Sequence, residues 1–308
     1  MATQLELADL LADGPLAVDV LAERTKTHAP SLYRMLRALE STGIFIQSSP
    51  RVFANTPSSE CLRRHAAGSQ WAWIRISLCA DAPVFDGWRG LMHALQNGTP
   101  GFDQLHGMSA WNYFRSAPQM GAIFNEAMRD LSASITPAVT ASYDWSQFPV
   151  IADIGGGIGT QLSSILDANP SCRGILFDQA QVVAQAPKPS RMQLVGGDFF
   201  AEIPIHANAY LLRWIIHDWD DDKAITILEN IRKAAPQDAH VLLVESVVPE
   251  TAEFDMSKWM DMNMLVMAGG RERTADQFRE LYHQAGFDLE QIVPTPSALN
   301  IVAGKLRT

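Results

Sequence analysis

The chain has 308 residues, of which 47% are hydrophobic and 19% are charged. This composition supplies enough apolar material for two domains of roughly 100–200 residues each, and it excludes a disordered chain or a coiled coil. No stretch reaches the roughly 18 uninterrupted apolar residues of a membrane helix, and the first residues lack the basic region of a signal peptide. The net charge of -10 argues against general binding to nucleic acid or to an anionic membrane. The three cysteines are too widely spaced for a metal site or a disulfide framework, so we expect a cytoplasmic protein.

The N-terminal part of the chain predicts a small helical domain with a short ribbon. Helical patterns cover residues 5–11, 18–24 and 31–41, and two strand patterns follow at 44–46 and 51–53. A group of helices followed by a two-stranded ribbon is typical of a winged helix.

The charge distribution indicates a domain boundary near residue 100. Residues 1–100 carry nine basic and nine acidic residues, so the acidic excess lies in the rest of the chain. The turn-rich stretch 97–101 forms a suitable joint. We therefore expect a winged-helix domain over residues 1–100 and a second domain over residues 101–308.

The second domain predicts a doubly wound α/β fold. It begins with a helical stretch and continues with short apolar runs separated by helical patterns. Apolar runs without polar alternation are typical of strands buried on both faces, and hence of a mostly parallel, Rossmann-like sheet. The expected strands are residues 150–154, 174–177, 192–195, 209–212 and 241–244, with a last antiparallel pair at 288–293 and 300–303.

A glycine-rich loop follows the first of these strands and runs from Asp153 to Thr160. Gly155 and Gly157 let a ligand approach the backbone closely, and the helix that follows presents free N–H groups. A dinucleotide fingerprint needs its third glycine at position 160, whereas this chain has it at Gly159. That spacing is typical of S-adenosylmethionine (SAM) methyltransferases. The alternative is a tight structural turn.

Two acids at the ends of the next two strands fit the same ligand. Asp178 ends the second strand, where a carboxylate can accept hydrogen bonds from both hydroxyls of a ribose. Asp198 ends the third strand, where it can accept from the amino group of adenine, with Phe199 against the ring. A helix cap or a turn explains either acid alone equally well. In register with the glycine loop, the pair favours an adenosine-containing cofactor.

The fourth strand leads into His217. In an open α/β sheet, ligands bind beyond the carboxyl ends of the parallel strands. His217 is therefore a candidate catalytic residue. The alternative, which is the commoner role of a single histidine, is a core or capping side chain.

Four motifs in sequence order resemble one known family. They are GGDFF, YLLRWIIHDWDDDKAITIL, VESVVPE and GGRERTADQF. They are similar to the SAM-dependent small-molecule O-methyltransferases of the plant caffeate and flavonoid type, whose bacterial relatives act on aromatic polyketides. The resemblance covers nearly the whole chain, and in this family the N-terminal winged helix serves dimerisation. It implies a homodimer that methylates a hydroxyl of a small aromatic compound and releases S-adenosylhomocysteine (SAH).

The resemblance also implies which residues form the site. The family's catalytic base falls on His217, and its two flanking glutamates fall on Glu245 and Glu272. Two such carboxylates would raise the pKa of the base, which favours activity at mildly alkaline pH. Arg213 departs from the lysine that plant members usually have. The implied cofactor contacts are Gly155, Gly157, Asp178, Asp198, Phe199, Arg213 and Met128.

A methionine-rich helix predicts the acceptor pocket. Five methionines lie between Asp255 and Ala268, and thioethers pack adaptably against flat rings. An ordinary helix core explains any single methionine equally well. The expected acceptor-binding residues are Phe124, Asp218, Met260, Asn263, Met264 and Met267.

Two other functions compete with methyl transfer. One is an enzyme that retains the fold and SAM but catalyses a hydroxylation or a pericyclic step, and the intact base with its glutamates argues against it. The other is a DNA-binding regulator that uses the winged helix. The balanced charge of the first hundred residues and the acidic chain disfavour that regulator. Its contacts would be Arg24, Lys26, Arg34 and Arg37.

Overall fold

The computed structural model describes residues 1–187 and 190–307. By their contacts, these residues group into two compact units, each assembled from two separate stretches of chain. The first unit contains Met1–Arg89 and Met108–Leu131, and the second contains Gly90–Gly107 and Ser132–Thr308. A domain boundary near residue 100 stays a prediction.

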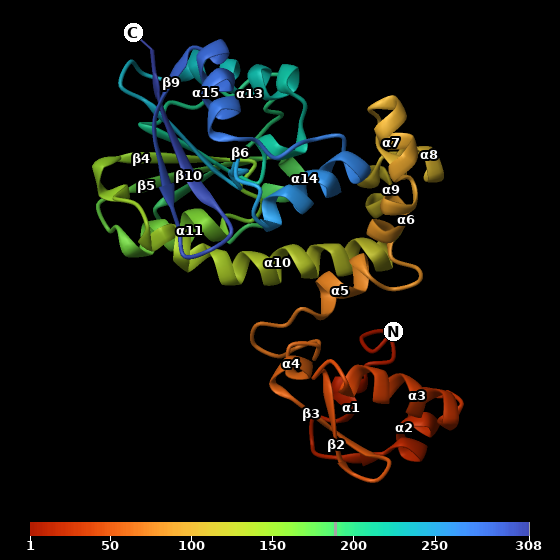
Figure 1. Ribbon diagram of the computed structural model, residues 1–308. Helices are drawn as coiled ribbons and strands as arrows, with labels where there is room; N and C mark the ends of the chain where they lie inside the picture. Colours follow the sequence, from red (N-terminus) through yellow and green to blue (C-terminus); the bar gives the residue numbers. More distant parts are fainter. Residues whose placement is uncertain (188–189, 308) are drawn as a thin grey trace. The chain divides into compact units, whose positions relative to one another are not determined.

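The first unit combines a three-stranded antiparallel sheet with short helices (Figure 1). Its strand order is β1-β3-β2. Leu7, Leu21, Leu36 and Phe53 are fully buried in its core. The strands are β1 (Leu16–Ala17), β2 (Phe45–Ser49) and β3 (Val52–Asn55), and the helices are α1 (Leu7–Leu10), α2 (Val18–Thr25), α3 (Ala29–Glu40), α4 (Pro57–Glu60), α5 (Trp71–Ser77), α6 (Pro83–Arg89) and α9 (Ala110–Ser116).

The three helices and the ribbon expected in this region are confirmed, with boundaries shifted by at most three residues. Strand β1 was not expected, because a strand of two residues shows no alternation that a sequence pattern could reveal. That this arrangement is a winged helix stays a prediction.

A seven-stranded sheet organises the second unit. Its strand order is β6-β5-β4-β7-β8-β10-β9. The first five of these strands pair in parallel, whereas β10 runs antiparallel to both β8 and β9. The predicted doubly wound α/β sheet with a last antiparallel pair is therefore confirmed. The strands are β4 (Val150–Ile154), β5 (Arg173–Asp178), β6 (Met192–Gly196), β7 (Ala209–Arg213), β8 (His240–Glu245), β9 (Phe287–Pro294) and β10 (Asn300–Leu306).

Helices connect these strands, and α10 contributes residues to both units. The acidic start of α13 acts as expected, because a carboxylate oxygen of Asp220 accepts the N–H of Lys223 at 2.9 Å and caps the helix. No helix within the described ranges is long and apolar enough to cross a membrane. The remaining helices are α7 (Leu91–Asn97), α8 (Gly101–His106), α10 (Pro118–Ala141), η1 (Trp145–Gln147), α11 (Thr160–Ala168), α12 (Ala180–Val183), η2 (Ile216–Asp218), α13 (Asp221–Ala234), α14 (Met256–Met267) and α15 (Ala275–Ala285).

Side chains of the central strands alternate between two hydrophobic cores. In β8, Val241 and Leu243 pack with residues of α13 and α15, while Leu242 and Val244 pack with residues of α11. Figure 1 shows α13 and α15 on one side of the sheet and α11 on the other. Both faces of the sheet are covered, which is why these strands lack polar alternation.

The strand order positions the site. The chain starts the sheet at β4 and then adds strands on both of its sides, first β5 and later β7. Beyond the carboxyl ends of parallel strands, such a reversal leaves a crevice where ligands bind. The glycine loop, Asp178, Asp198, His217 and Glu245 all end or follow strands at this edge.

Candidate active site

The glycine loop turns from β4 into α11 through residues with positive φ. Gly155 and Gly157 have φ angles of 70° and 62°, which residues with a side chain rarely adopt. A Cβ atom on Gly155 would also lie 2.5 Å from Cδ1 of Ile215. Glycine at this position therefore lets the loop approach the segment that leads to His217.

The carboxylate of Asp178 is tied to this loop. Its Oδ2 accepts the N–H of Gly157 at 2.8 Å, and its Oδ1 accepts the N–H of Gln179 at 2.7 Å. Burial raises the pKa of Asp178, and these two hydrogen bonds oppose the rise. Each carboxylate oxygen retains a second lone pair, so the side chain can still accept hydrogen bonds from two hydroxyls of a ligand.

A pocket of about 530 Å³ lies beside Asp178, and Asp198 and Phe199 also line it. Phe200 and Trp219 contribute further aromatic surface, with ring centroids 4.8 Å apart in an edge-to-face arrangement. One oxygen of Asp198 accepts the N–H of Phe200 at 2.9 Å, so this acid also stabilises a turn. Carboxylate acceptors beside apolar rings match the hydroxyls and the base of a nucleoside.

Arg213 lies outside this pocket and binds neutral oxygen atoms instead. Its guanidinium donates to Oγ1 of Thr136 at 2.8 Å, to Oε1 of Gln161 at 3.1 Å and to Oγ of Ser132 at 2.9 Å. Burial lowers the pKa of Arg213, and the charge of Asp153 opposes this effect. Arg213 thus joins β7 to α10 and α11, and its contact with a cofactor stays a prediction.

Met128 and Phe124 belong to the first unit. Met128 packs against a cluster that contains Trp71, and the ring of Phe124 stacks on Phe114 with centroids 4.4 Å apart. The contacts expected of Met128 with the cofactor and of Phe124 with the acceptor stay predictions.

His217 lies in η2, directly after β7, and forms a buried pair. Its Nδ1 is 2.8 Å from Oε1 of Glu272, and the two side chains are 12% and 1% exposed. Glu245, at the end of β8, accepts the N–H groups of Ile215 and Ile216 on one oxygen, at 3.1 and 2.9 Å. One glutamate therefore orients the imidazole, while the other holds the backbone that carries it.

Two backbone features allow Glu272 to approach the imidazole of His217. Trp214, between β7 and η2, has a φ of 54°, a conformation that is uncommon for a bulky residue and is found at functional sites. Gly270 packs on the backbone of η2, where an added Cβ would lie 2.0 Å from the carbonyl oxygen of His217. The absence of a side chain at Gly270 brings Glu272 within reach of the imidazole.

The charges around His217 decide its protonation. Burial lowers its pKa, but the charges of Glu245, Asp218 and Glu272 outweigh burial and raise the pKa to about 10. Burial raises the pKa of Glu245 to about 7 and that of Asp218 to about 6, and the charge of His217 opposes both rises. The site therefore favours a positive charge on the imidazole.

Parts of this site remain available to a ligand or to an ion. Oε2 of Glu245 and Oε2 of Glu272 are buried, and neither has a hydrogen-bond partner among the described residues. Together with a ring nitrogen of His217, the glutamates offer ligand atoms within 4.8 Å of one another, a spacing that a divalent cation could also use. Asp218 lies nearby, with Oδ1 3.5 Å from Nε2 of His217.

The methionine-rich segment forms helix α14, as expected. Its Asp261 accepts the backbone N–H of Glu272 on Oδ1 at 2.9 Å, which fixes the glutamate to the helix. Four of the six expected acceptor-binding residues lie on α14, where the last is buried and the others are partly buried: Met260, Asn263, Met264 and Met267. Their contact with an acceptor stays a prediction.

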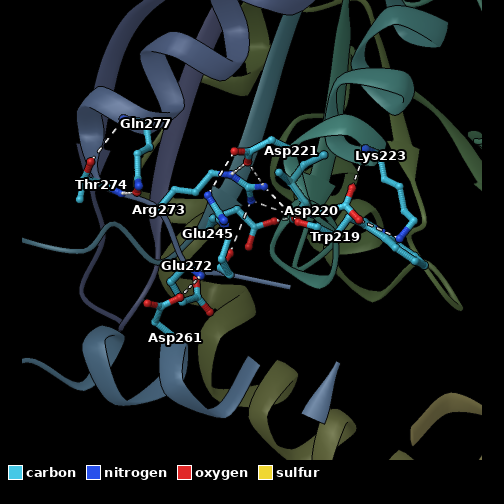
Figure 2. Close-up of polar contacts among 12 residues, drawn as sticks. Trp219, Asp220, Asp221, Lys223, Glu245, Asp261, Glu272, Arg273, Thr274 and Gln277 are labelled. Atoms are coloured by element: carbon cyan, nitrogen blue, oxygen red, sulfur yellow. Dashed lines mark hydrogen bonds and ion pairs between the residues drawn. The ribbon is translucent and has the colours of Figure 1, made fainter. Parts of the chain in front are cut away.

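Sequence analysis missed Asp261 and Arg273. Arg273 is 1% exposed, and it donates to the carbonyl oxygen of Ile216 at 3.1 Å. It also donates to the carbonyl oxygen of Trp219 at 3.0 Å (Figure 2). The motif GGRERT contains Arg273, but a charged residue in a polar stretch carries no local sign that it is buried. The signal available was its position directly after Glu272.

Comparison with known proteins agrees with these features. The family model of the O-methyltransferase domain matches residues 88–288, and that of the O-methyltransferase dimerisation domain matches residues 1–64. The chain is 38% identical to phenazine O-methyltransferase PhzM of Lysobacter antibioticus, across 99% of this chain and 91% of that protein.

Solved structures show the same similarity. Mitomycin 7-O-methyltransferase MmcR superposes with a TM-score of 0.91 at 30% identity, covering 99% of this chain and 92% of that one. The neocarzinostatin O-methyltransferase NcsB1, solved with SAM and 2-hydroxy-5-methyl naphthoic acid, gives a TM-score of 0.85 at 31% identity, covering 99% and 94%. Because both family models match and these relatives span nearly the whole chain, the protein belongs to the family of SAM-dependent O-methyltransferases.

Proposed function

We propose that this enzyme transfers a methyl group from SAM to a phenolic hydroxyl of a small aromatic natural product, with His217 as the general base. The buried hydrogen bond of 2.8 Å between Nδ1 of His217 and Oε1 of Glu272 carries the proposal. The relatives support an aromatic acceptor, since one is named for phenazine and another was solved with a hydroxynaphthoic acid.

The pairing with Glu272 selects the imidazole tautomer in which Nε2 can act as a base. The pKa of about 10 means that the neutral form of His217 grows as the pH rises; in that form the Glu272 oxygen accepts the Nδ1–H and Nε2 keeps a lone pair. A phenol has a pKa of about 10. Because the pKa of His217 is also raised to about 10, Nε2 can take the phenol proton with little energetic cost as the oxygen attacks. The surrounding carboxylates then stabilise the imidazolium.

The pocket beside Asp178 fits the nucleoside part of SAM. Asp178 would accept the ribose hydroxyls, Asp198 the adenine amino group, and Phe199 would pack on the ring. Gly155 and Gly157 would let the backbone approach the rest of the cofactor. When bound, SAM supplies an electrophilic methyl group whose leaving thioether needs no proton. The chain therefore has to activate only the acceptor.

The acceptor would lie against α14 and beside Nε2 of His217. We assign the acceptor contacts of the second unit to Asp218, Met260, Asn263, Met264 and Met267. The apolar members would pack on the flat ring, while Asp218, 3.5 Å from Nε2, lies where the reacting hydroxyl must come.

We also propose that the enzyme is a homodimer. The match of residues 1–64 to a dimerisation domain supports this. Leu78, Phe85 and Trp111 of the first unit are also large apolar side chains that are exposed in the single chain. A large contiguous apolar surface often marks a protein–protein interface, and these side chains are candidates for one.

A product assay tests the reaction. The protein is incubated with SAM and a panel of phenols, naphthols and phenazinols, and the products are analysed by mass spectrometry. The proposal predicts a product heavier by one CH₂ group. A product that gains an oxygen, or an isomer of the substrate, would instead establish the non-methylating alternative.

A matched pair of variants tests the base. His217→Ala should lower kcat by roughly 10²–10⁴-fold and leave SAH affinity unchanged, because a positioned base contributes about that much. His240→Ala is the control, since Nε2 of His240 also pairs with a glutamate, Glu290, at 3.2 Å but at the opposite end of β8. Equal activity of the two variants on a phenol would refute the assignment.

A further inference from the structure

The buried side chain of Arg273 holds the loop that carries His217. Its Nη1 donates to the carbonyl oxygen of Ile216 at 3.1 Å, and its Nη2 donates to that of Trp219 at 3.0 Å. Its Nε and Nη2 also donate to Oδ1 of Asp221, at 3.0 and 2.7 Å. Figure 2 shows Arg273 reaching from the segment of Glu272 toward Trp219 and Asp221.

The chemistry of these contacts suits arginine alone. A buried guanidinium is costly unless its donors are used, and its five N–H groups lie in one rigid plane. Here they bind a carboxylate and two carbonyl oxygens of a single loop. Those carbonyls belong to the residue before His217 and to the residue after Asp218, so the donors bracket the proposed base and a proposed acceptor contact.

We propose that Arg273 is a positioning residue that holds His217 against Glu272 and, through Trp219, one wall of the cofactor pocket. This inference rests on the role of His217 proposed above. Trp219 lines the pocket beside Asp178, so the same guanidinium contacts both the loop of the base and the wall of the pocket. Arg273 is not among the residues that line this pocket, so it acts through these neighbours.

The segment that carries Arg273 is itself firmly anchored. Oδ1 of Asp261 accepts the N–H of Glu272 at 2.9 Å, and the carbonyl oxygen of Arg273 accepts the N–H of Val248 at 2.9 Å. Consecutive residues therefore make complementary contacts: Glu272 binds the imidazole, and Arg273 binds the backbone around it. A small displacement of one part would lengthen the hydrogen bond of the other.

The charges facing His217 allow a specific test. Glu245 from β8, Asp218 from η2 and Glu272 from the segment after α14 raise its pKa, while burial lowers it. Arg273→Lys keeps a positive charge behind the loop but cannot bridge three acceptors. A change in the pKa of His217 in this variant would therefore report the position of the loop rather than a lost charge.

The matched control is Arg271→Lys. The side chain of Arg271 donates to Oδ2 of the same Asp221 at 3.2 Å, but it is 48% exposed and its guanidinium is bonded to no carbonyl of the loop. Both variants change one guanidinium that binds Asp221, but only the guanidinium of Arg273 is buried and holds η2.

Three measurements are made on the full-length enzyme with SAM and one phenol. For Arg273→Lys we expect kcat to fall roughly 10–100-fold, as small misplacements of reacting groups do. We expect the acid limb of the kcat profile to move down by about one pH unit, because a longer contact with Glu272 lowers the pKa of His217. Calorimetry should show weaker SAH binding, because Trp219 loses its anchor. Arg271→Lys should behave as the wild type in all three.

The outcomes separate this inference from the proposed function. Arg273→Lys could reduce the amount of folded protein and leave both the acid limb and the SAH affinity unchanged. That result would overturn the positioning role, because it is what a merely structural role predicts. If His217→Ala is inactive while Arg273→Lys matches Arg271→Lys, only the positioning role fails. If Arg273→Lys does not fold, Asp221→Asn replaces it, because Asp221 binds the same guanidinium and is 49% exposed. Asp221→Asn should lower kcat, the pH of the acid limb and the SAH affinity, each by less than Arg273→Lys. Unchanged values there would also overturn the inference.

Discussion

The imidazole of His217 and the carboxylate of Glu272 form a buried pair, with Nδ1 2.8 Å from Oε1, although the residues are 55 positions apart in the chain. The two groups come from different connections, one after β7 and one after α14. Their meeting joins two of the motifs identified in the sequence: one supplies the imidazole and the other supplies the carboxylate.

Glu272→Gln should lower kcat on a phenol by less than His217→Ala, roughly 10–100-fold. Glutamine preserves the shape but removes a charge that raises the pKa of His217, so the acid limb of the pH–rate profile should move to lower pH. Steady-state rates from pH 6 to beyond the raised pKa of His217, about 10, measure this. Glu290→Gln, on the exposed partner of His240, should keep the wild-type profile. An unmoved limb in Glu272→Gln would contradict the pairing.

Asp178→Ala should weaken SAH binding by about 1–3 kcal/mol, because charged hydrogen bonds to the ribose are lost. Titration calorimetry measures the affinity, and NAD should not bind to the wild type. Asp167→Ala is the control, since Asp167 is 86% exposed and lies at the end of α11. Equal affinities of both variants would remove Asp178 from the cofactor site.

Asp153→Asn should stabilise the protein above neutral pH. Asp153 is buried under the glycine loop, and burial raises its pKa from 3.8 to about 7. Between these values the unfolded chain releases the proton while the folded chain keeps it, so wild-type stability falls as the pH rises from 4 through 7. Asparagine cannot ionise, and the gain at pH 8 should be on the order of 2–4 kcal/mol. Thermal unfolding at pH 4 and pH 8 tests this, with no gain expected at pH 4.

Chelation should leave the activity unchanged. His217, Glu245 and Glu272 offer ligand atoms within 4.8 Å of one another, but Nδ1 of His217 is already hydrogen-bonded to Glu272. We therefore expect equal rates before and after dialysis against EDTA. If activity disappears and returns with a divalent cation, the cluster binds a metal and the general-base assignment is wrong.

The enzyme should behave as a dimer in solution. Multi-angle light scattering at micromolar concentration should give twice the chain mass of 33.9 kDa. Leu78→Lys places a charge at an exposed apolar position of the first unit and should shift the equilibrium toward the monomer. The control, Met256→Lys, changes an exposed apolar residue of the second unit. A wild-type protein of the single-chain mass would refute the dimer.

The sequence by itself determined the family and the positions of the sheet's strands along the chain. Apolar runs without alternation located β4 to β8, because strands buried on both faces need apolar side chains at every position. The spacing of Gly155, Gly157 and Gly159 separated a SAM loop from a dinucleotide loop. These signals are local, because each depends only on residues that are close together in the sequence.

Only the tertiary structure decided the contacts that each charged group makes. It paired His217 with Glu272, gave Glu245 the backbone N–H groups of Ile215 and Ile216, and turned Arg213 toward α10 and α11 rather than into the pocket beside Asp178. It also buried Arg273, which local sequence gave no reason to expect inside the protein. The physical reason is that the burial and the pKa of a charged group depend on neighbours across space, and these come from distant parts of the chain.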